Sequence, residues 1–200
     1  MGMMGRWRFR WAMWGFIVIL SACGSSTSPL DSQFLAIARS YLSYGRVDDQ
    51  NRWAPGLCAF YPSEARLSAS NDDHTHGGKI YFVLARDRGA YVRRPALMQP
   101  EGQVIVKEAW EPKEVAKSEE TLKSRHDAAG SYVPGLERGG KYYTTGNKLG
   151  LFIMLKEGSR WQYGTVTADG AKVTQSGNIP SCVGCHQDAK PDRLFGLPSH

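Results

Sequence analysis

Two overlapping stretches near the C-terminus each have the pattern of two β-strands joined by a tight turn. The segment "LFIMLKEGSRWQYGTV" (151–166) has its turn at "EGS", and "WQYGTVTADGAKVTQSG" (161–177) has its turn at "ADG". Glycine readily adopts the backbone conformations that such hairpins require. Because one strand belongs to both hairpins, the sequence predicts an antiparallel sheet in this part of the chain.

Further segments have the composition and boundaries of strands. They are rich in β-branched and aromatic residues and are bounded by Gly, Pro or Asp, as is typical of strands. Together with the hairpins, they predict strands over residues 78–85, 103–110, 148–158 and 160–170. The predicted fold class is α+β, a mainly antiparallel β-sheet with flanking helices.

One amphipathic helix is predicted ahead of the strands, over residues 30–44. Its helical spacing predicts a cap at Asp31 or Ser32 and one apolar face, formed by Phe34, Leu35, Ala38, Tyr41 and Leu42. Residues 111–147 are polar and glycine-rich, so we expect a surface excursion there, with the charged stretch 111–127 as a candidate solvated helix.

The first 22 residues have the pattern of an export signal. A basic start, with Arg6, Arg8 and Arg10, precedes a short apolar run and then small residues. The apolar run is too short to span a membrane as a helix. Loss of the three arginines on export lowers the formal net charge from +6 to +3, and no cluster of basic and aromatic residues suggests nucleic-acid binding.

The sequence "LSAC", which ends at Cys23, resembles the lipobox of bacterial lipoproteins. This resemblance implies cleavage before Cys23 and lipid attachment to it; the alternative is an ordinary signal peptide that leaves Cys23 as a free thiol. Residues 23–30 would form a flexible tether, and residues 31–200 the domain. The resemblance implies a location on the periplasmic side of a bacterial membrane, and Gly24 after the cysteine points to the outer membrane.

The motif "CVGCH" at residues 182–186 carries the clearest chemistry in the chain. Cys-x-x-Cys-His is the attachment sequence of a c-type haem, in which two thiols bind the haem edge and the histidine ligates the iron. The sequence therefore predicts one covalently bound haem c, with Cys182 and Cys185 as attachment points and His186 as the iron ligand. The alternatives are a redox disulfide and half of a zinc site, although no second ligand pair has suitable spacing. Cys58 has no obvious partner, and we interpret it as a small buried residue.

Several stretches in order resemble the cytochrome P-460 family, which includes the cytochromes c′-beta. They are "THGGKIYFVLARDRGAYV", "PEGQVIVKEAW", "LFIMLKEGSRWQYGTVTADG" and "CVGCHQDAKPDRLFG", within residues 61–196. The resemblance implies a mainly antiparallel sheet with helices, often a homodimer, and a haem iron with an open or weakly filled distal position. It implies binding of nitric oxide or oxidation of hydroxylamine, with an unidentified redox partner protein.

The resemblance also assigns a role to Lys107, because the family's second covalent link to the haem comes from a lysine in the stretch that matches "VIVKE". On an alternating strand Lys107 shares a face with Ile105, while Val104 and Val106 occupy the other. A buried amine loses its proton readily and can act as a nucleophile. The alternative is an exposed lysine that pairs with a carboxylate across the sheet.

The resemblance places Phe152 where hydroxylamine-oxidising members have a carboxylate over the iron. General-base chemistry on the substrate would need that carboxylate. Phe152 and Met154 share a strand face, which predicts an apolar distal pocket suited to a neutral diatomic molecule; plain core packing is the alternative for both. Met154 or Met98 as a sixth ligand would instead make the protein an electron-transfer cytochrome.

The histidines of "NDDHTHGG" could belong to a metal site, with His74 and His76 beside Asp72 and Asp73. The simpler interpretation, which we prefer, is a polar loop before a strand. His126 lies in a charged run and is expected to be solvated, and Trp161 and Tyr163 are expected to be core residues.

Overall fold

The structure of the protein is a computed structural model that describes residues 27–47, 63–64, 66–67, 78–93, 98–189 and 192–194. The predicted export signal lies outside the described residues, as do Cys23, Cys58, His74 and His76. Within these ranges no helix is both long enough and apolar enough to cross a membrane.

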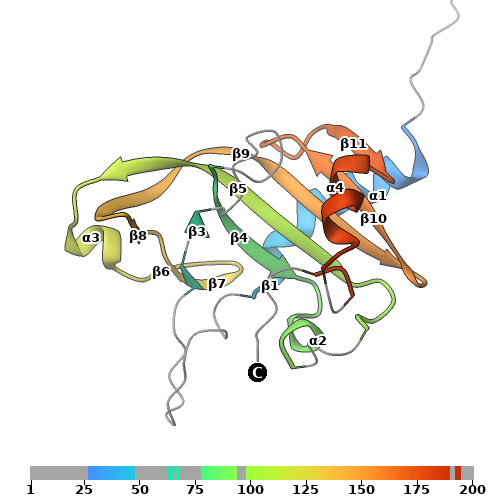
Figure 1. The fold of residues 1–200 in the computed structure, drawn as a ribbon, viewed down its shortest axis with the longest axis horizontal. Helices are drawn as coiled ribbons and strands as arrows, with labels where there is room; N and C mark the ends of the chain where they lie inside the picture. Colours follow the sequence, from blue (N-terminus) through green and yellow to red (C-terminus); the bar gives the residue numbers. More distant parts are fainter. Residues whose placement is uncertain are drawn as a thin grey trace, which may run out of the picture.

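An eight-stranded sheet forms the main body of the fold (Figure 1). Its strands run in the order β1-β4-β5-β9-β10-β11, with β3 beside β4 and β8 beside β9, and every pairing in it is antiparallel. The predicted α+β class and both predicted hairpins, β9–β10 and β10–β11, are confirmed. The strand bounds are β1 Gly45–Arg46, β3 Arg66–Leu67, β4 Ile80–Ala85, β5 Val104–Val115, β8 Leu136–Arg138, β9 Lys141–Glu157, β10 Arg160–Val166 and β11 Val173–Gly177.

The polar segment between the predicted strands differs from the expectation of a solvated helix. Strand β5 continues to Val115 and β9 begins at Lys141, so the two long strands pair along this region. Only α3 (Glu119–Leu122) is helical there. The rest adds β8, β6 (Arg125–Asp127) and β7 (Gly130–Val133). Strands β6 and β7 join β2 (Ser63–Glu64), from earlier in the chain, in a three-stranded sheet of order β2-β7-β6. In the strand residues of this segment, backbone hydrogen bonds to neighbouring strands take the place of the hydrogen bonds of a helix.

Helix α1 (Pro29–Ser40) begins inside the predicted tether and ends before Tyr44. The predicted cap was wrong: Ser28 is the N-cap, and its hydroxyl accepts a hydrogen bond from the Asp31 amide at 3.0 Å. Pro29 at the first helical position suits this start, because it has no amide hydrogen to leave unpaired. A 3₁₀ turn, Tyr41–Ser43, follows the helix.

The buried face of α1 differs slightly from the predicted one. Phe34, Ala38 and Tyr41 are buried as expected, and Ile37 joins them. Leu42 is 41% exposed, because the change to a 3₁₀ turn after Ser40 alters the rotation per residue and carries Leu42 off the buried face.

Helix α1 covers one face of the sheet, behind it in Figure 1. The core on this face includes Val104 and Val106 of β5, so the predicted alternation along that strand is confirmed. Gly164 of β10 allows the closest approach, since a Cβ there would lie 2.7 Å from the ring of Phe34. This face is therefore closed by direct contact between α1 and the sheet.

Helix α4 (Pro180–His186) lies over the opposite face, in front of the sheet in Figure 1. A second apolar cluster forms there, to which α2 (Arg88–Arg93) contributes Tyr91. Its buried members are Val47, Ala85, Tyr91, Ile105, Met154, Trp161, Tyr163, Ile179 and Leu194, with Cys182 and Val183 packed against them. The two clusters lie on opposite sides of the same strands.

Candidate functional site

Helix α4 holds the whole Cys-x-x-Cys-His motif in one short element. Pro180 stands at its N-terminal end and His186 is its last residue. Residues three or four positions apart lie on one side of a helix, so Cys182 lies on the same side as Cys185 and as His186. Cys182 packs against the apolar cluster, whereas Cys185 is exposed. The motif is thus displayed at the border between the cluster and solvent.

The imidazole of His186 is held by the chain that follows α4. Its Nδ1 atom lies 2.7 Å from the carbonyl oxygen of Arg193, which favours the tautomer with the proton on Nδ1 and the lone pair on Nε2. Its ring also lies against Tyr163, with ring centroids 5.5 Å apart. Metal-bound histidines typically donate their second nitrogen to a carbonyl or carboxylate in this way, so the residues fit a histidine-ligated iron.

Burial sets the titration of His186 and of the tyrosine beneath it. Burial lowers the pKa of His186, with the positive charges of Lys107 and Arg193 adding to the effect and the carbonyl of Arg193 opposing it. A neutral imidazole is the form that ligates a metal. Burial likewise raises the pKa of Tyr163. The Tyr163 hydroxyl is buried without a partner at hydrogen-bond geometry among the described residues, although the Arg193 guanidinium lies near it.

The alternatives to haem attachment find less support in this arrangement. Burial raises the pKa of the Cys182 thiol, whereas a redox-active Cys-x-x-Cys pair needs a thiol whose pKa is lowered. In the described part of the chain, no three His, Cys, Asp or Glu side chains come together as a metal site would require. A closed structural zinc site needs four such ligands.

Lys107 points from β5 to the same face as His186. It shares this face with Ile105, as predicted, and its pair partners are Val83 on β4 and Phe152 on β9. Its Nζ atom lies 3.9 Å from the centroid of the Tyr81 ring. Burial, helped by the positive charge of Lys79, lowers the pKa of Lys107 to about 7. The carboxylate partner that the alternative interpretation requires is not found among the described residues.

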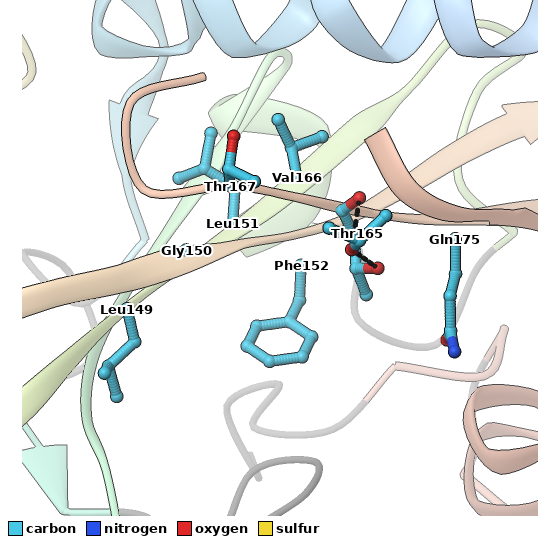
Figure 2. Close-up of a pocket in the computed structure, with 9 residues that line it drawn as sticks. Leu149, Gly150, Leu151, Phe152, Thr165, Val166, Thr167 and Gln175 are labelled. Carbon is cyan, nitrogen blue, oxygen red and sulfur yellow. Dashed lines mark hydrogen bonds between the residues drawn. The ribbon is translucent and has the colours of Figure 1, made fainter. Parts of the chain in front are cut away.

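Phe152 lies next to Lys107 and borders an open groove at the β9–β10–β11 end of the face. Figure 2 shows its ring on the opposite side of β9 from Leu151, with Leu149 and Gln175 on the ring's side. The groove has a volume of about 360 Å³. Its lining comprises Leu149, Gly150, Leu151, Phe152, Thr165, Val166, Thr167, Thr174 and Gln175. The surroundings of Phe152 are thus part apolar and part hydroxyl and amide, which is more polar than the sequence predicted.

The two candidate methionine ligands lie in different surroundings. Met154 is buried in the α4-side cluster, where it pairs with Ile105 and Tyr163 across the sheet. Tyr163 in turn contacts the His186 ring, so Met154 packs on the side of that histidine. Met98 is 63% exposed. The role of sixth ligand stays a prediction for both methionines.

Sequence reasoning missed the contribution of residues 192–194 to this site. The contact that matters is made by the backbone carbonyl of Arg193. A carbonyl is present in every residue, so no side-chain pattern could have revealed it. The predicted core residues Trp161 and Tyr163 are buried as expected, and His126 is exposed.

Neither a known family model nor a curated protein matches this chain.

Proposed function

We propose that this protein is a mono-haem c-type cytochrome of the cytochrome P-460 type that binds small nitrogen compounds, above all nitric oxide. The observation that carries the proposal is the meeting of two features on one buried face. A Cys-x-x-Cys-His helix presents an oriented, neutral His186, and Lys107, whose pKa is lowered by burial, lies on the sheet close enough to affect it. Ionisable groups with perturbed pKa values gather at functional sites more often than elsewhere.

Three residues of α4 would hold the haem. The thiols of Cys182 and Cys185 would form the thioether links, and Nε2 of His186 would ligate the iron while Nδ1 donates to Arg193. Bound there, the haem iron would supply a coordination position for a small ligand and a one-electron redox couple.

Lys107 supplies a group that can hold or release a proton near neutral pH. With a pKa of about 7, its amine is neutral in a large fraction of molecules at physiological pH. A neutral amine is a nucleophile, and the resemblance implies that in the loaded protein this amine would be linked to the haem edge. Without that bond, it remains a proton donor or acceptor on the same face.

Phe152 favours ligand binding over hydroxylamine oxidation. It pairs with Lys107 across the sheet, at the position where the resemblance expects a carboxylate base. No carboxylate is among the described groups that set the pKa of Lys107. Among the described residues, removal of protons from a bound amine would then rest on Lys107, whereas nitric oxide needs no general base.

The rest of the proposal concerns the setting of the protein in the cell. We place it on the periplasmic side of a bacterial membrane, as a lipoprotein anchored through Cys23, most simply in the outer membrane. The polar tether would let the domain reach a redox partner protein. A homodimer, as in the family, is part of the same proposal.

The test is the absorption spectrum of the ferrous protein, produced with the haem-attachment machinery and without the lipid anchor. A covalently bound haem with a Soret band that changes on addition of nitric oxide is the expected result. A strongly red-shifted Soret band that is lost in Lys107→Met would reveal the Lys107 link and revive hydroxylamine oxidation. The matched control is Cys182→Ser/Cys185→Ser, which should carry no covalent haem. A ferrous haem protein that ignores nitric oxide would refute the proposal.

A further inference from the structure

A buried ion pair ties the chain after α4 to the sheet. Nζ of Lys156, near the end of β9, lies 2.6 Å from Oδ1 of Asp192, and the two side chains are only 2% and 3% exposed. A buried pair is costly to desolvate and persists only where further hydrogen bonds satisfy its atoms. Here the backbone N–H of Gln99 donates to Oδ2 of Asp192 at 2.7 Å, and the Trp161 indole donates to Oδ1 at 3.2 Å.

The same contacts fix the backbone around Asp192. The Trp161 indole also donates to the Asp192 carbonyl at 2.9 Å, and the Arg193 amide donates to the Ala189 carbonyl at 2.9 Å. Asp192 and Arg193 have φ angles of +50° and +61°, which side chains other than glycine seldom adopt. A strained backbone of this kind persists only when its surroundings hold it in place.

These contacts fix the position of the Arg193 carbonyl group. Arg193 turns its carbonyl oxygen to within 2.7 Å of Nδ1 of His186. The turn at 192–194 thus supplies a backbone contact to Nδ1. The ion pair is therefore two steps from the imidazole: Lys156 and Trp161 fix Asp192, and Asp192 fixes the neighbouring carbonyl.

We propose that Lys156 and Asp192 are positioning residues for the proximal histidine. They hold the Arg193 carbonyl against Nδ1, and thereby set the orientation and electron-donating strength of His186 as an iron ligand. The hydrogen bond from Nδ1–H to a carbonyl makes the imidazole more basic, and a more basic ligand stabilises ferric over ferrous iron. This inference rests on the proposed haem site and adds the device that tunes it.

The first test is Asp192→Asn in the haem-loaded protein. Asparagine tolerates the positive φ at this position, so the variant removes the charge without changing the backbone preference. The expected result is a reduction potential shifted upward, by about 59 mV for a tenfold change in the ferric-to-ferrous preference of a one-electron couple. The iron–histidine stretching frequency of the ferrous protein should fall with it.

A second variant tests the same role without leaving the buried charge of Lys156 unpaired. Trp161→Phe removes the indole donor to Asp192 and leaves the ion pair intact. We therefore expect the reduction potential to shift upward again, by a smaller amount. The control is Glu114→Gln, which breaks the Lys141–Glu114 pair, a lysine–carboxylate contact of 2.8 Å that is exposed to solvent. It should leave both the potential and the stretching frequency unchanged.

Two outcomes overturn the inference while leaving the haem proposal standing. One is a folded, haem-loaded Asp192→Asn protein with wild-type potential and stretching frequency; the other, should that variant not fold, is a Trp161→Phe protein with both values unchanged. Absence of covalent haem from the wild type would instead refute the proposed function. In that case the nitrogen chemical shifts of His186 test the positioning role of Lys156 and Asp192 in the haem-free protein. Nδ1 should be protonated in the wild type, and a mixture of tautomers should appear in both variants.

Discussion

Strand β5 buries a charged side chain on each face of the sheet, and the two are accommodated differently. On the α1 face, Glu108 accepts a hydrogen bond from the Tyr41 hydroxyl and lies 3.4 Å from Lys148 Nζ. Lys148 also donates to the Tyr41 hydroxyl at 2.7 Å. On the α4 face, Lys107 has an aromatic ring rather than a carboxylate beside it, and its pKa falls to about 7. A stable core pairs its charges; the α4 face keeps a reactive group, which is typical of a site that acts on something else.

The α1 face should be the more sensitive to loss of packing. Phe34 is fully buried against Gly164, and its replacement by alanine leaves a cavity that the rigid sheet cannot fill. We expect Phe34→Ala to lower the free energy of unfolding by roughly 3–5 kcal/mol, measured by chemical denaturation. Leu42→Ala, at an exposed position, should change it by no more than roughly 0.5 kcal/mol. Equal losses would contradict the assigned face of α1.

In the haem-free protein, replacement of Lys107 should stabilise the fold, whereas most core substitutions destabilise it. Its folded-state pKa of about 7 lies below the ordinary lysine value of 10.5, so the unfolded chain binds more protons between these two values. Stability should therefore rise with pH through this window, and the penalty should be complete below pH 7. Lys107→Met should remove the rise and stabilise the protein at pH 6, by an amount on the order of a few kcal/mol.

The matched control for Lys107 is Lys113→Met, on the exposed part of β5. At pH 6, and again at pH 9, the denaturation curve of this variant should match that of the wild type at the same pH. A Lys107→Met protein that keeps the wild-type dependence on pH would show that Lys107 is solvated rather than buried.

The Tyr41–Glu108–Lys148 group should show what a satisfied buried charge contributes. Burial and the negative charge of Glu108 raise the pKa of Tyr41 far above its usual value, so the hydroxyl keeps its proton and donates to Glu108. Tyr41→Phe should cost roughly 1–3 kcal/mol of stability, because Glu108 loses a donor while still buried. Tyr142→Phe removes a hydroxyl bonded to Glu137 at the surface and should be nearly neutral in the same denaturation assay.

The smallest effect is expected from Met154. Replacement by leucine conserves volume, so the stability should fall by less than about 1.5 kcal/mol. The ferrous absorption spectrum should remain that of the wild type, as it should for the exposed Met98→Leu. Loss of a low-spin ferrous spectrum in Met154→Leu alone would identify Met154 as the sixth ligand, and the protein would then be an electron carrier.

Much of the fold followed from local pattern. The β9–β10 and β10–β11 hairpins, the alternation of Val104, Ile105 and Val106, and the apolar face around Phe34 were predicted because each depends on residues near one another in sequence. The length of β5 and β9 was not predicted. Their polar continuations, to Val115 and from Lys141, pair with each other, and the start of β9 also pairs with β8.

The sequence by itself predicted the chemistry that we propose for α4, because three residues of fixed spacing suffice to state that prediction. Tertiary structure alone decided which lysines are buried and how. Lys107, Lys148 and Lys156 all belong to strands, yet one lies over a tyrosine ring, one contacts Glu108 and one pairs with Asp192. Desolvation and charge pairing depend on groups brought together from distant parts of the chain, and for that reason the reactivity of a lysine cannot be read from its neighbours in sequence.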